Sequence, residues 1–301
     1  MEPAPAFAEL SPEEFKRKFL SIYKPVSILP PGQDMALVLQ ATEGCSHNRC
    51  TFCTFYRDRP FHIKTLPEFR RHVAQVREFM GPAMRMRRTL FLADASAIVT
   101  PVPLLISMLD VVNASFEMVP PGENAVHYRL LHPESFDGVY SFIDAFSTRS
   151  KTVDDFSRLA ERNLRRVYMG LETGHDQLRQ WLRKAGTSAD AIDAVQKIRR
   201  GGVSVGVIVM IGIGGKRFAQ QHVADTVHAV NSMELNQNDQ VYFSEFIDSP
   251  DLEYGRIAEQ DGIEPLSRQE TRVQMESIRA GLSFPGQAPR MSVYDIHEIV
   301  Y

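Results

Sequence analysis

The chain has 301 residues, of which 44% are hydrophobic and 24% are charged, and its formal net charge is −3. This is an ordinary globular composition with ample length for a full core, and the charge balance gives no sign of a nucleic-acid-binding surface. No run approaches the roughly 18 apolar residues of a membrane span, and residues 1–10 lack the basic start of a signal peptide. We therefore expect a cytoplasmic protein.

The first predicted element is a helix that begins at residue 11. The sequence Ser-Pro-Glu-Glu at 11–14 is a capping box with proline at the first helical position, and the amphipathic pattern continues to about Tyr23. Prolines at positions 25, 30 and 31 then indicate a linker. We assign residues 1–33 to an N-terminal helix and linker.

Strand and helix patterns alternate from residue 35 onward. The expected strands are 35–40, 89–93, 140–146, 166–171, 203–210 and 240–246, and the expected helices are 65–80, 102–113, 153–162, 188–200 and 219–233. Such alternation predicts an α/β fold with a parallel sheet, either a closed barrel or an open doubly wound sheet. Residues 116–138 form an expected insertion, and residues 251–301 an expected C-terminal segment that caps the substrate.

The only three cysteines, Cys45, Cys50 and Cys53, follow the first expected strand with the spacing C-x4-C-x2-C. Thiolates are the usual ligands of iron–sulfur clusters, so these residues can hold three irons of a [4Fe–4S] cube. The fourth iron would then be open to a chelating small molecule. The competing interpretation is a zinc site completed by His47, but zinc sites usually pair C-x2-C with a second, distant pair.

This loop resembles the cluster loop of radical S-adenosylmethionine (radical SAM) enzymes, although their commonest spacing is C-x3-C-x2-C. The sequence Gly-Leu-Glu-Thr-Gly at 170–174 resembles a motif of members related to oxygen-independent coproporphyrinogen oxidase and the Elongator catalytic subunit. The resemblance covers about residues 35–250. It implies a partial (β/α)6 TIM-like barrel over 34–250, with cluster and cofactor at the carboxyl ends of the strands.

The resemblance also implies cofactor-binding roles for residues at the strand ends. Glu172 would contact S-adenosylmethionine, and Lys184, or Arg183, would reach the carboxylate of that cofactor. An unpaired buried carboxylate is costly, which favours a functional role for Glu172. Asp94 and Ser96 follow the second strand and would hold the amino group of the cofactor, with a local Asx turn as the alternative for Asp94.

Ser147 and Arg149 follow the third expected strand and could bind ribose or carboxylate. Helix capping at Ser150 or Thr152 is the competing interpretation of this segment. Gly212 and Gly214 follow the fifth strand and would let the backbone approach adenine and ribose, although the spacing is not a nucleotide-binding fingerprint. Two further residues, Glu245 and Tyr242, are candidates for a catalytic role.

The implied function is that of a radical SAM enzyme. Its [4Fe–4S] cluster would reductively cleave S-adenosylmethionine, and the 5′-deoxyadenosyl radical would abstract hydrogen from a small molecule or peptide. A flavodoxin- or ferredoxin-type protein would donate the electron, without membrane or nucleic-acid partners. Residues 116–138 and the C-terminal segment would form a lid. The alternative class is a non-catalytic protein, either zinc-stabilised or an iron–sulfur electron carrier.

Overall fold

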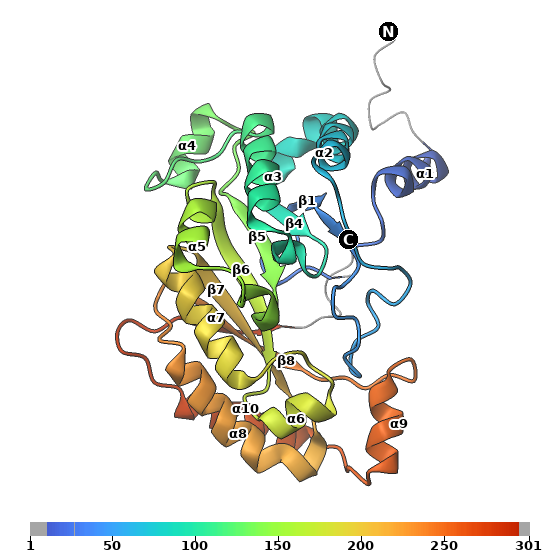
Figure 1. Ribbon diagram of the computed structural model, residues 1–301, viewed down its shortest axis with the longest axis vertical. Coiled ribbons are helices and arrows are strands. Elements are labelled where there is room, and N and C mark those ends of the chain that lie inside the picture. Colours follow the sequence, from blue (N-terminus) through green and yellow to red (C-terminus); the bar gives the residue numbers. More distant parts are fainter. Residues whose placement is uncertain (1–10, 27, 295–301) are drawn as a thin grey trace.

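The computed structural model describes residues 11–26 and 28–294, and seven parallel strands form its main sheet in the order β1-β4-β5-β6-β7-β8-β9 (Figure 1). The strands are β1 (Leu37–Gln40), β4 (Leu90–Ala93), β5 (Val139–Ile143), β6 (Leu164–Glu172), β7 (Ser204–Ile211), β8 (Gln240–Glu245) and β9 (Arg290–Tyr294). Every pairing between neighbours in this sheet is parallel. All strand carboxyl ends therefore meet at one end of the molecule, where a site can be assembled.

Helices cover the outside of the sheet. They are α1 (Pro12–Ile22), α2 (Leu66–Met80), α3 (Val102–Ser115), α4 (Ala125–Leu131), α5 (Val153–Ala160), α6 (Asp176–Trp181), α7 (Ser188–Arg200), α8 (Gly215–Ser232), α9 (Glu253–Gln260) and α10 (Arg268–Gly281). Capping boxes start α1, α2 and α10 at Ser11, Thr65 and Ser267, because each hydroxyl accepts a hydrogen bond from the third helical N–H. None of the described helices has the length and apolar character needed to cross a membrane.

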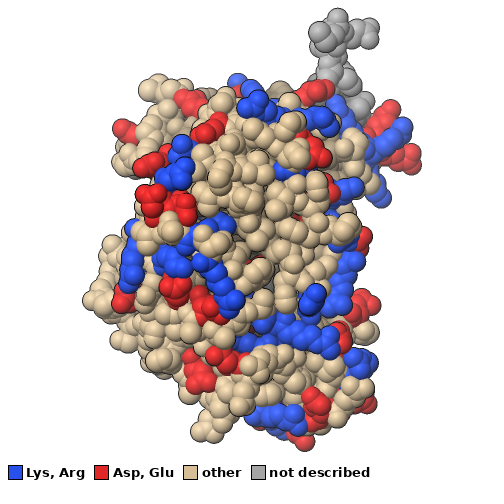
Figure 2. Space-filling model, viewed as in Figure 1, with Lys and Arg blue, Asp and Glu red and all other residues tan. Residues whose placement is uncertain are grey.

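The central strands are buried on both faces, as expected for a parallel sheet. In β7, for example, Val205, Val207 and Val209 on one face have no exposed surface, and Ile208 on the other face is also buried. Lysine, arginine, aspartate and glutamate side chains are interspersed over the face of the molecule shown in Figure 2, in keeping with the small net charge. The predicted α/β fold with a partial barrel is confirmed.

The barrel was predicted to end at residue 250, but in the structure it continues beyond that residue. β9 pairs with β8 from Arg290 to Tyr294, and α10 packs against α8 as an outer helix of the wall. β9 escaped prediction because it is a short edge strand with only its last residue buried. Residues 295–301, the end of the expected capping segment, lie outside the described part of the chain.

The segment 116–138 lies at the wrong end of the barrel to act as a lid. It joins the end of α3 to the start of β5, so it sits at the amino ends of the strands. Figure 1 shows α4, which belongs to this segment, at the end of the molecule opposite α6 and α9. The expectation that residues 116–138 cover the site is therefore wrong, because helix-to-strand connections and strand-to-helix connections lie at opposite ends of a parallel barrel.

The linker before β1 fills the gap between the two edge strands of the sheet, β1 and β9. The hydroxyl of Tyr294 donates a hydrogen bond to the carbonyl of Leu29 (2.8 Å), and Gln33 donates one to the hydroxyl of Tyr168 inside the barrel (3.1 Å). Leu29 itself is fully buried. This linker is therefore part of the barrel wall, and it places its neighbour Ile28 beside the cavity described below.

Acidification should destabilise this fold through two buried histidines. Burial lowers the pKa of His72 and of His222 to about 4 each, and Nε2 of His72 accepts a hydrogen bond from the N–H of Gln40. The unfolded chain binds more protons between pH 6.5 and 4, so the stabilisation is complete above about pH 6.5 and is lost as the pH falls towards 4. We expect the free energy of unfolding to fall by about 2 kcal/mol per histidine between pH 7 and pH 5.

Urea unfolding at several pH values measures this effect. The variant His72→Gln keeps an acceptor for Gln40 and should lose about half of the pH dependence. An unchanged pH dependence in that variant would show that His72 is not a source of it.

Candidate functional site

A cavity of about 420 Å³ opens at the carboxyl ends of the strands. Its lining residues come from five strands and from the cysteine loop, and those on strands are Phe142, Ile143, Tyr168, Gly170, Glu172, Ile208, Met210, Ser244, Glu245 and Tyr294. All three cysteines line the same cavity, as do Asp144 and Lys184. Thiols and charged side chains therefore line the same cavity.

The cysteine loop is fixed at its base by a short hairpin and by Asp94. Strands β2 (Thr42–Glu43) and β3 (His62–Ile63) pair antiparallel on either side of the loop. The Asp94 carboxylate accepts hydrogen bonds from the N–H of Gly44 and the side chain of Gln40, both 3.0 Å long. Burial raises the pKa of Asp94, and these hydrogen bonds offset part of the rise. Asp94 does not line the cavity, so the expected direct contact with a cofactor is replaced by a role in anchoring the loop.

Within the loop, backbone contacts hold the cysteines in place. Asn48 has a positive φ of 45° and its N–H donates to the sulfur of Cys45 (3.3 Å). The guanidinium of Arg57 donates to the carbonyls of Cys50 (3.0 Å) and Cys53 (3.2 Å). The extra residue of the C-x4-C spacing is therefore taken up in a tight turn at Asn48 that keeps Cys45 in contact with the cavity.

The chemistry of this loop fits an iron–sulfur cluster. Burial raises the pKa of Cys50 to about 12 and also raises that of Cys53, so both thiols stay protonated at neutral pH unless a cationic group replaces their protons. The hydroxyl of Ser46 is buried and finds no hydrogen-bond partner among the described residues. A sulfur of a cluster held by this loop would supply the missing acceptor.

The described structure gives no support to a zinc site completed by His47. Nε2 of His47 lies 2.6 Å from the carbonyl oxygen of Arg183, and only a protonated ring nitrogen can make that hydrogen bond. That nitrogen is therefore not available as a metal ligand. Within residues 11–26 and 28–294, no three or more His, Cys, Asp or Glu side chains gather closely enough to hold a single metal ion.

Next to the thiols lies a cluster of charged groups centred on Lys184. Its ammonium is 3.3 Å from the carboxylate of Glu172 and 3.7 Å from that of Asp144. Ser96 donates a hydrogen bond to the other oxygen of Asp144 (3.1 Å). Burial alone would lower the pKa of Lys184, but the carboxylates of Glu172 and Asp144 outweigh burial and raise it. Arg183, the alternative to Lys184, pairs instead with Glu253 at 2.9 Å.

Asp144 was missed in the sequence because the third strand is shorter than predicted. β5 ends at Ile143, and residues Ala145–Thr148 form a 3-10 turn, so Asp144 is the residue at the strand end. The hydroxyl of Ser147 donates back to the carbonyl of Asp144 (2.7 Å). Arg149, which was predicted to bind the cofactor, points away and pairs with Asp190 at 2.8 Å. Neither Ser147 nor Arg149 lines the cavity, and Thr152 caps α5 as the competing interpretation expected.

The Glu172 carboxylate reaches Lys184 because of the backbone at the end of β6. Glu172 has a positive φ of 61°, and the register with β7 shifts between Gly170 and Glu172. Buried Arg179 donates hydrogen bonds to the carbonyls of Leu171 (2.6 Å) and Ala185 (3.1 Å). Arg179 thereby ties the strand end that carries Glu172 to the turn that carries Lys184.

Gly170 leaves the space that this carboxylate occupies, and this leads to a prediction. A Cβ at position 170 would overlap Oε1 of Glu172 and lie 3.2 Å from Nζ of Lys184. The variant Gly170→Ala should therefore displace the carboxylate and destabilise the fold by about 1–3 kcal/mol, the cost of overpacking a well-filled site. Urea unfolding of this variant tests the effect, and Gly286→Ala, at a glycine with open space around it, serves as the control. Equal stability of the two variants would contradict the proposed packing.

The two glycines after β7 do not approach the cavity. The N–H of Gly212 donates to Gln274 (2.7 Å) and that of Gly214 donates to the hydroxyl of Tyr254 (2.9 Å). A Cβ at Gly214 would lie 2.8 Å from Leu178. These glycines allow α6, α8 and α10 to pack closely, and Met210 and Ile208 form the cavity wall instead.

The two catalytic candidates are separated by the structure. Glu245 lines the cavity, whereas Tyr242 lies deeper in the barrel and its hydroxyl contacts Gln240. Three other tyrosines, Tyr56, Tyr168 and Tyr294, also line the cavity, and of these Tyr168 was not foreseen. Tyr168 could have been found, because it precedes Glu172 by four residues and side chains two and four positions apart share one face of a strand.

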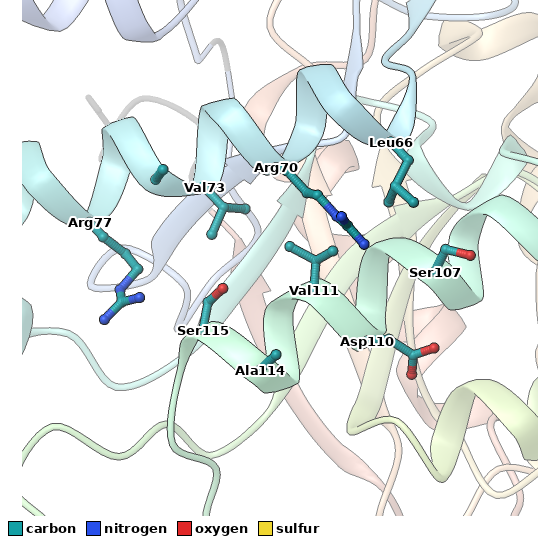
Figure 3. A pocket seen from close by; sticks show the side chains of 10 residues that line it. Leu66, Arg70, Val73, Arg77, Ser107, Asp110, Val111, Ala114 and Ser115 are labelled. Carbon is teal, nitrogen blue, oxygen red and sulfur yellow. The ribbon is translucent and has the colours of Figure 1, made fainter.

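A second hollow, of about 470 Å³, lies between α2 and α3 on the outer helical layer. Figure 3 shows the residues of α2 and α3 around this hollow, among them Arg70 and Arg77 on α2 and Asp110 and Ser115 on α3. Asp110 is already paired with Arg162 at 2.8 Å. This hollow contains no thiol and no strand-end residue, so we place the candidate site at the carboxyl ends of the strands.

Comparison with known proteins supports this placement. Residues 104–227 match the family model described as the radical SAM superfamily, a stretch that contains Glu172 and Lys184 but not the cysteine loop. No protein of curated function matches the sequence of this chain.

The fold resembles those of several solved structures. Coproporphyrinogen III oxidase (HemN) from Escherichia coli, described as a radical SAM enzyme, is 14% identical with a TM-score of 0.51, and the match covers 93% of this chain and 58% of HemN. TsrM from Kitasatospora setae, a radical SAM methyltransferase solved with cobalamin and a [4Fe–4S] cluster, is 18% identical with a TM-score of 0.50, over 75% of this chain and 39% of TsrM. OxsB, a cobalamin-dependent radical enzyme, is 15% identical with a TM-score of 0.49, over 82% of this chain and 31% of OxsB. The matches thus span only 31% of the length of OxsB and 39% of that of TsrM.

Proposed function

We propose that this chain is a radical SAM enzyme that holds a [4Fe–4S] cluster at Cys45, Cys50 and Cys53, with S-adenosylmethionine bound beside the cluster. The observation that carries the proposal is that the three cysteines share one cavity with Glu172 and Lys184. When bound, these groups supply a one-electron cleavage that releases methionine and a 5′-deoxyadenosyl radical, which takes hydrogen from a small molecule or peptide.

The residues around Lys184 have the charges that S-adenosylmethionine requires. The cofactor carries a carboxylate, an ammonium and a sulfonium. Lys184 is the buried cation for the carboxylate, and Glu172 and Asp144 are acceptors for the ammonium or for ribose hydroxyls. Ser96 acts indirectly as a positioning residue, because it orients Asp144.

The apolar part of the wall and the segment after β8 keep water out of the site. Residues 246–252 include four cavity-lining side chains besides Phe246, and α9 follows directly. The N–H of Tyr254 on α9 donates to the carbonyl of Thr51 in the cysteine loop (3.1 Å). We assign the covering role to residues 246–260, and the barrel to residues 34–245 together with α10 and β9.

The electron must come from outside the chain, since Cys45, Cys50 and Cys53 are the only cysteines and can hold no second cluster. We assign this role to a flavodoxin- or ferredoxin-type protein in a reducing cytoplasm.

The proposal is tested by anaerobic reconstitution with iron and sulfide, followed by electron paramagnetic resonance of the dithionite-reduced protein. We expect about four irons per chain and a cluster signal that changes when S-adenosylmethionine is added, because one iron has no protein ligand. A colourless protein that binds one zinc would overturn the proposal. A cluster signal that does not change when S-adenosylmethionine is added would also overturn it.

A further inference from the structure

The part of the chain that carries the cysteine loop is more positively charged than the rest. Residues 11–64 contain eight Lys and Arg but only five Asp and Glu, whereas the whole chain has a formal net charge of −3. In Figure 2, several Lys and Arg side chains lie along the edge of the molecule where Figure 1 places the cysteine loop. A positive segment in an otherwise acidic chain indicates a surface for a negatively charged partner.

Two cations of this segment are available to such a partner. The side chains of Lys24 and Arg49 are exposed, and neither forms an ion pair within 4.0 Å or a hydrogen bond with any residue that the structure describes. Arg49 directly precedes Cys50. Lys24 lies in the linker, to which the cysteine loop is joined by a hydrogen bond from Arg59 to the carbonyl of Pro25 (3.0 Å). The linker and the loop therefore form one surface.

Positive charge continues on the other side of the loop, next to α9. The side chains of Arg183 and Arg256 are 52% and 58% exposed, and both pair with Glu253, at 2.9 and 3.1 Å. Arg183 is held beside the loop, because His47 contacts its carbonyl oxygen. One carboxylate cannot neutralise two guanidinium groups, so this side of the loop also has an excess of positive charge.

The loop itself adds a cation and an exposed aromatic ring. Arg57 is exposed, and the only carboxylate in residues 45–64, that of Asp58, is paired with Arg59 at 3.0 Å. Phe55 is 36% exposed and lies two residues after Cys53. Aromatic and arginine side chains are the residues that contribute most to binding at protein interfaces. All three cysteines are partly exposed, so a protein bound to this surface lies next to the thiols.

From these contacts we infer that the cysteine loop and five flanking cations form the docking surface for the electron donor, and that this donor is a small one-electron carrier with an acidic face. The five cations are Lys24, Arg49, Arg57, Arg183 and Arg256. The inference rests on the proposed function, and it adds the surface and the charge of the partner. The reduced carrier loses one electron and the cluster gains it, so no bond forms or breaks.

Charge pairing at a solvated surface suits a partner that must leave after each electron. It speeds association and gives binding that salt weakens, because exposed charges are screened over about 10 Å at 0.1 M salt. The paired carboxylates of Asp58 and Glu253 do not cancel this attraction, since each is matched by at least one arginine.

Calorimetric titration of the reconstituted protein with an oxidised flavodoxin that has an acidic face around its flavin tests the inference. We expect binding to weaken about tenfold or more between about 20 and 300 mM sodium chloride. At the lower salt concentration, Arg49→Glu should bind flavodoxin about tenfold more weakly than the parent protein, and Lys24→Glu severalfold more weakly.

The matched control is Arg158→Glu, which makes the same change of charge at an exposed arginine of α5 and should bind flavodoxin as the parent protein does. Binding that does not respond to salt would overturn the inference. So would equal binding by Arg49→Glu and Arg158→Glu, or the absence of binding by the parent protein up to about 1 mM flavodoxin.

A comparison of two reductants separates this inference from the proposed function. In Arg49→Glu, the rate of 5′-deoxyadenosine formation with reduced flavodoxin should fall about tenfold relative to the rate with dithionite, because a small reductant needs no docking surface. An equal loss with both reductants would overturn the inference. A parent protein that holds no cluster and cleaves nothing with dithionite would refute the proposed function, whereas the binding titration would still report on the surface.

Discussion

Replacing Cys50 with alanine should abolish formation of the [4Fe–4S] cluster and all activity that depends on it. The loop supplies three thiols, and the chain contains no fourth cysteine to take the place of a missing one. With two thiolates left, two irons lack protein ligands, and a cube with two open corners is lost in the presence of a chelator. Iron and sulfide analysis with the absorbance near 400 nm measures the result.

The matched control is Arg49→Ala, an exposed residue of the same loop. We expect this variant to bind iron as the parent protein does. The fold of Cys50→Ala should survive, because Cys50 is only partly buried and the loop is held by Asp94, Arg57 and the β2–β3 hairpin. Retention of about four irons by Cys50→Ala would show that Cys50 is not a ligand.

Replacing Lys184 with methionine should weaken binding of S-adenosylmethionine by about a hundredfold and destabilise the protein. Methionine keeps much of the length of lysine but removes the only cation that, among the residues the structure describes, lies within 4.0 Å of both Glu172 and Asp144. Removing one partner of a buried ion pair costs about 3–5 kcal/mol, because the remaining charges lose their compensation. Equilibrium binding of S-adenosylmethionine and urea unfolding give the two readouts.

A control variant separates the loss of a buried cation from a general effect of losing a lysine. Lys197→Met removes a surface lysine paired with Asp193 on α7, and it should show little stability deficit. A deficit in Lys197→Met equal to that in Lys184→Met would contradict the electrostatic account.

Local signals predicted most of the fold. Capping boxes mark the starts of α1 and α2 in the sequence, and the apolar runs of the parallel strands are long enough to be recognised. β9 has neither signal, because it is short, lies at an edge and owes its place to pairing with β8. The position of α4 could not be predicted, since it depends on which end of the barrel a connection occupies rather than on the sequence of the connection.

The sequence identified the site residues that belong to a recognisable motif. It missed the residue whose place in the site depends on where a strand ends. The three cysteines, Glu172 and Lys184 were each identified, and all of them line one cavity. Asp144 was missed because β5 ends three residues before the predicted end, a shift that turns Ser147 and Arg149 away and brings Asp144 to Lys184. A sequence alone places a strand end only to within a few residues. A shift of one residue moves a side chain to the other face of the strand.

The central claim is that this cavity cleaves S-adenosylmethionine reductively. The most direct measurement is the amount of 5′-deoxyadenosine that the anaerobically reconstituted, dithionite-reduced protein forms from S-adenosylmethionine. We expect 5′-deoxyadenosine from the parent protein and from Arg49→Ala, and none from Cys50→Ala. A protein that holds a complete cluster but forms no 5′-deoxyadenosine, or equal formation by Cys50→Ala, would contradict the account.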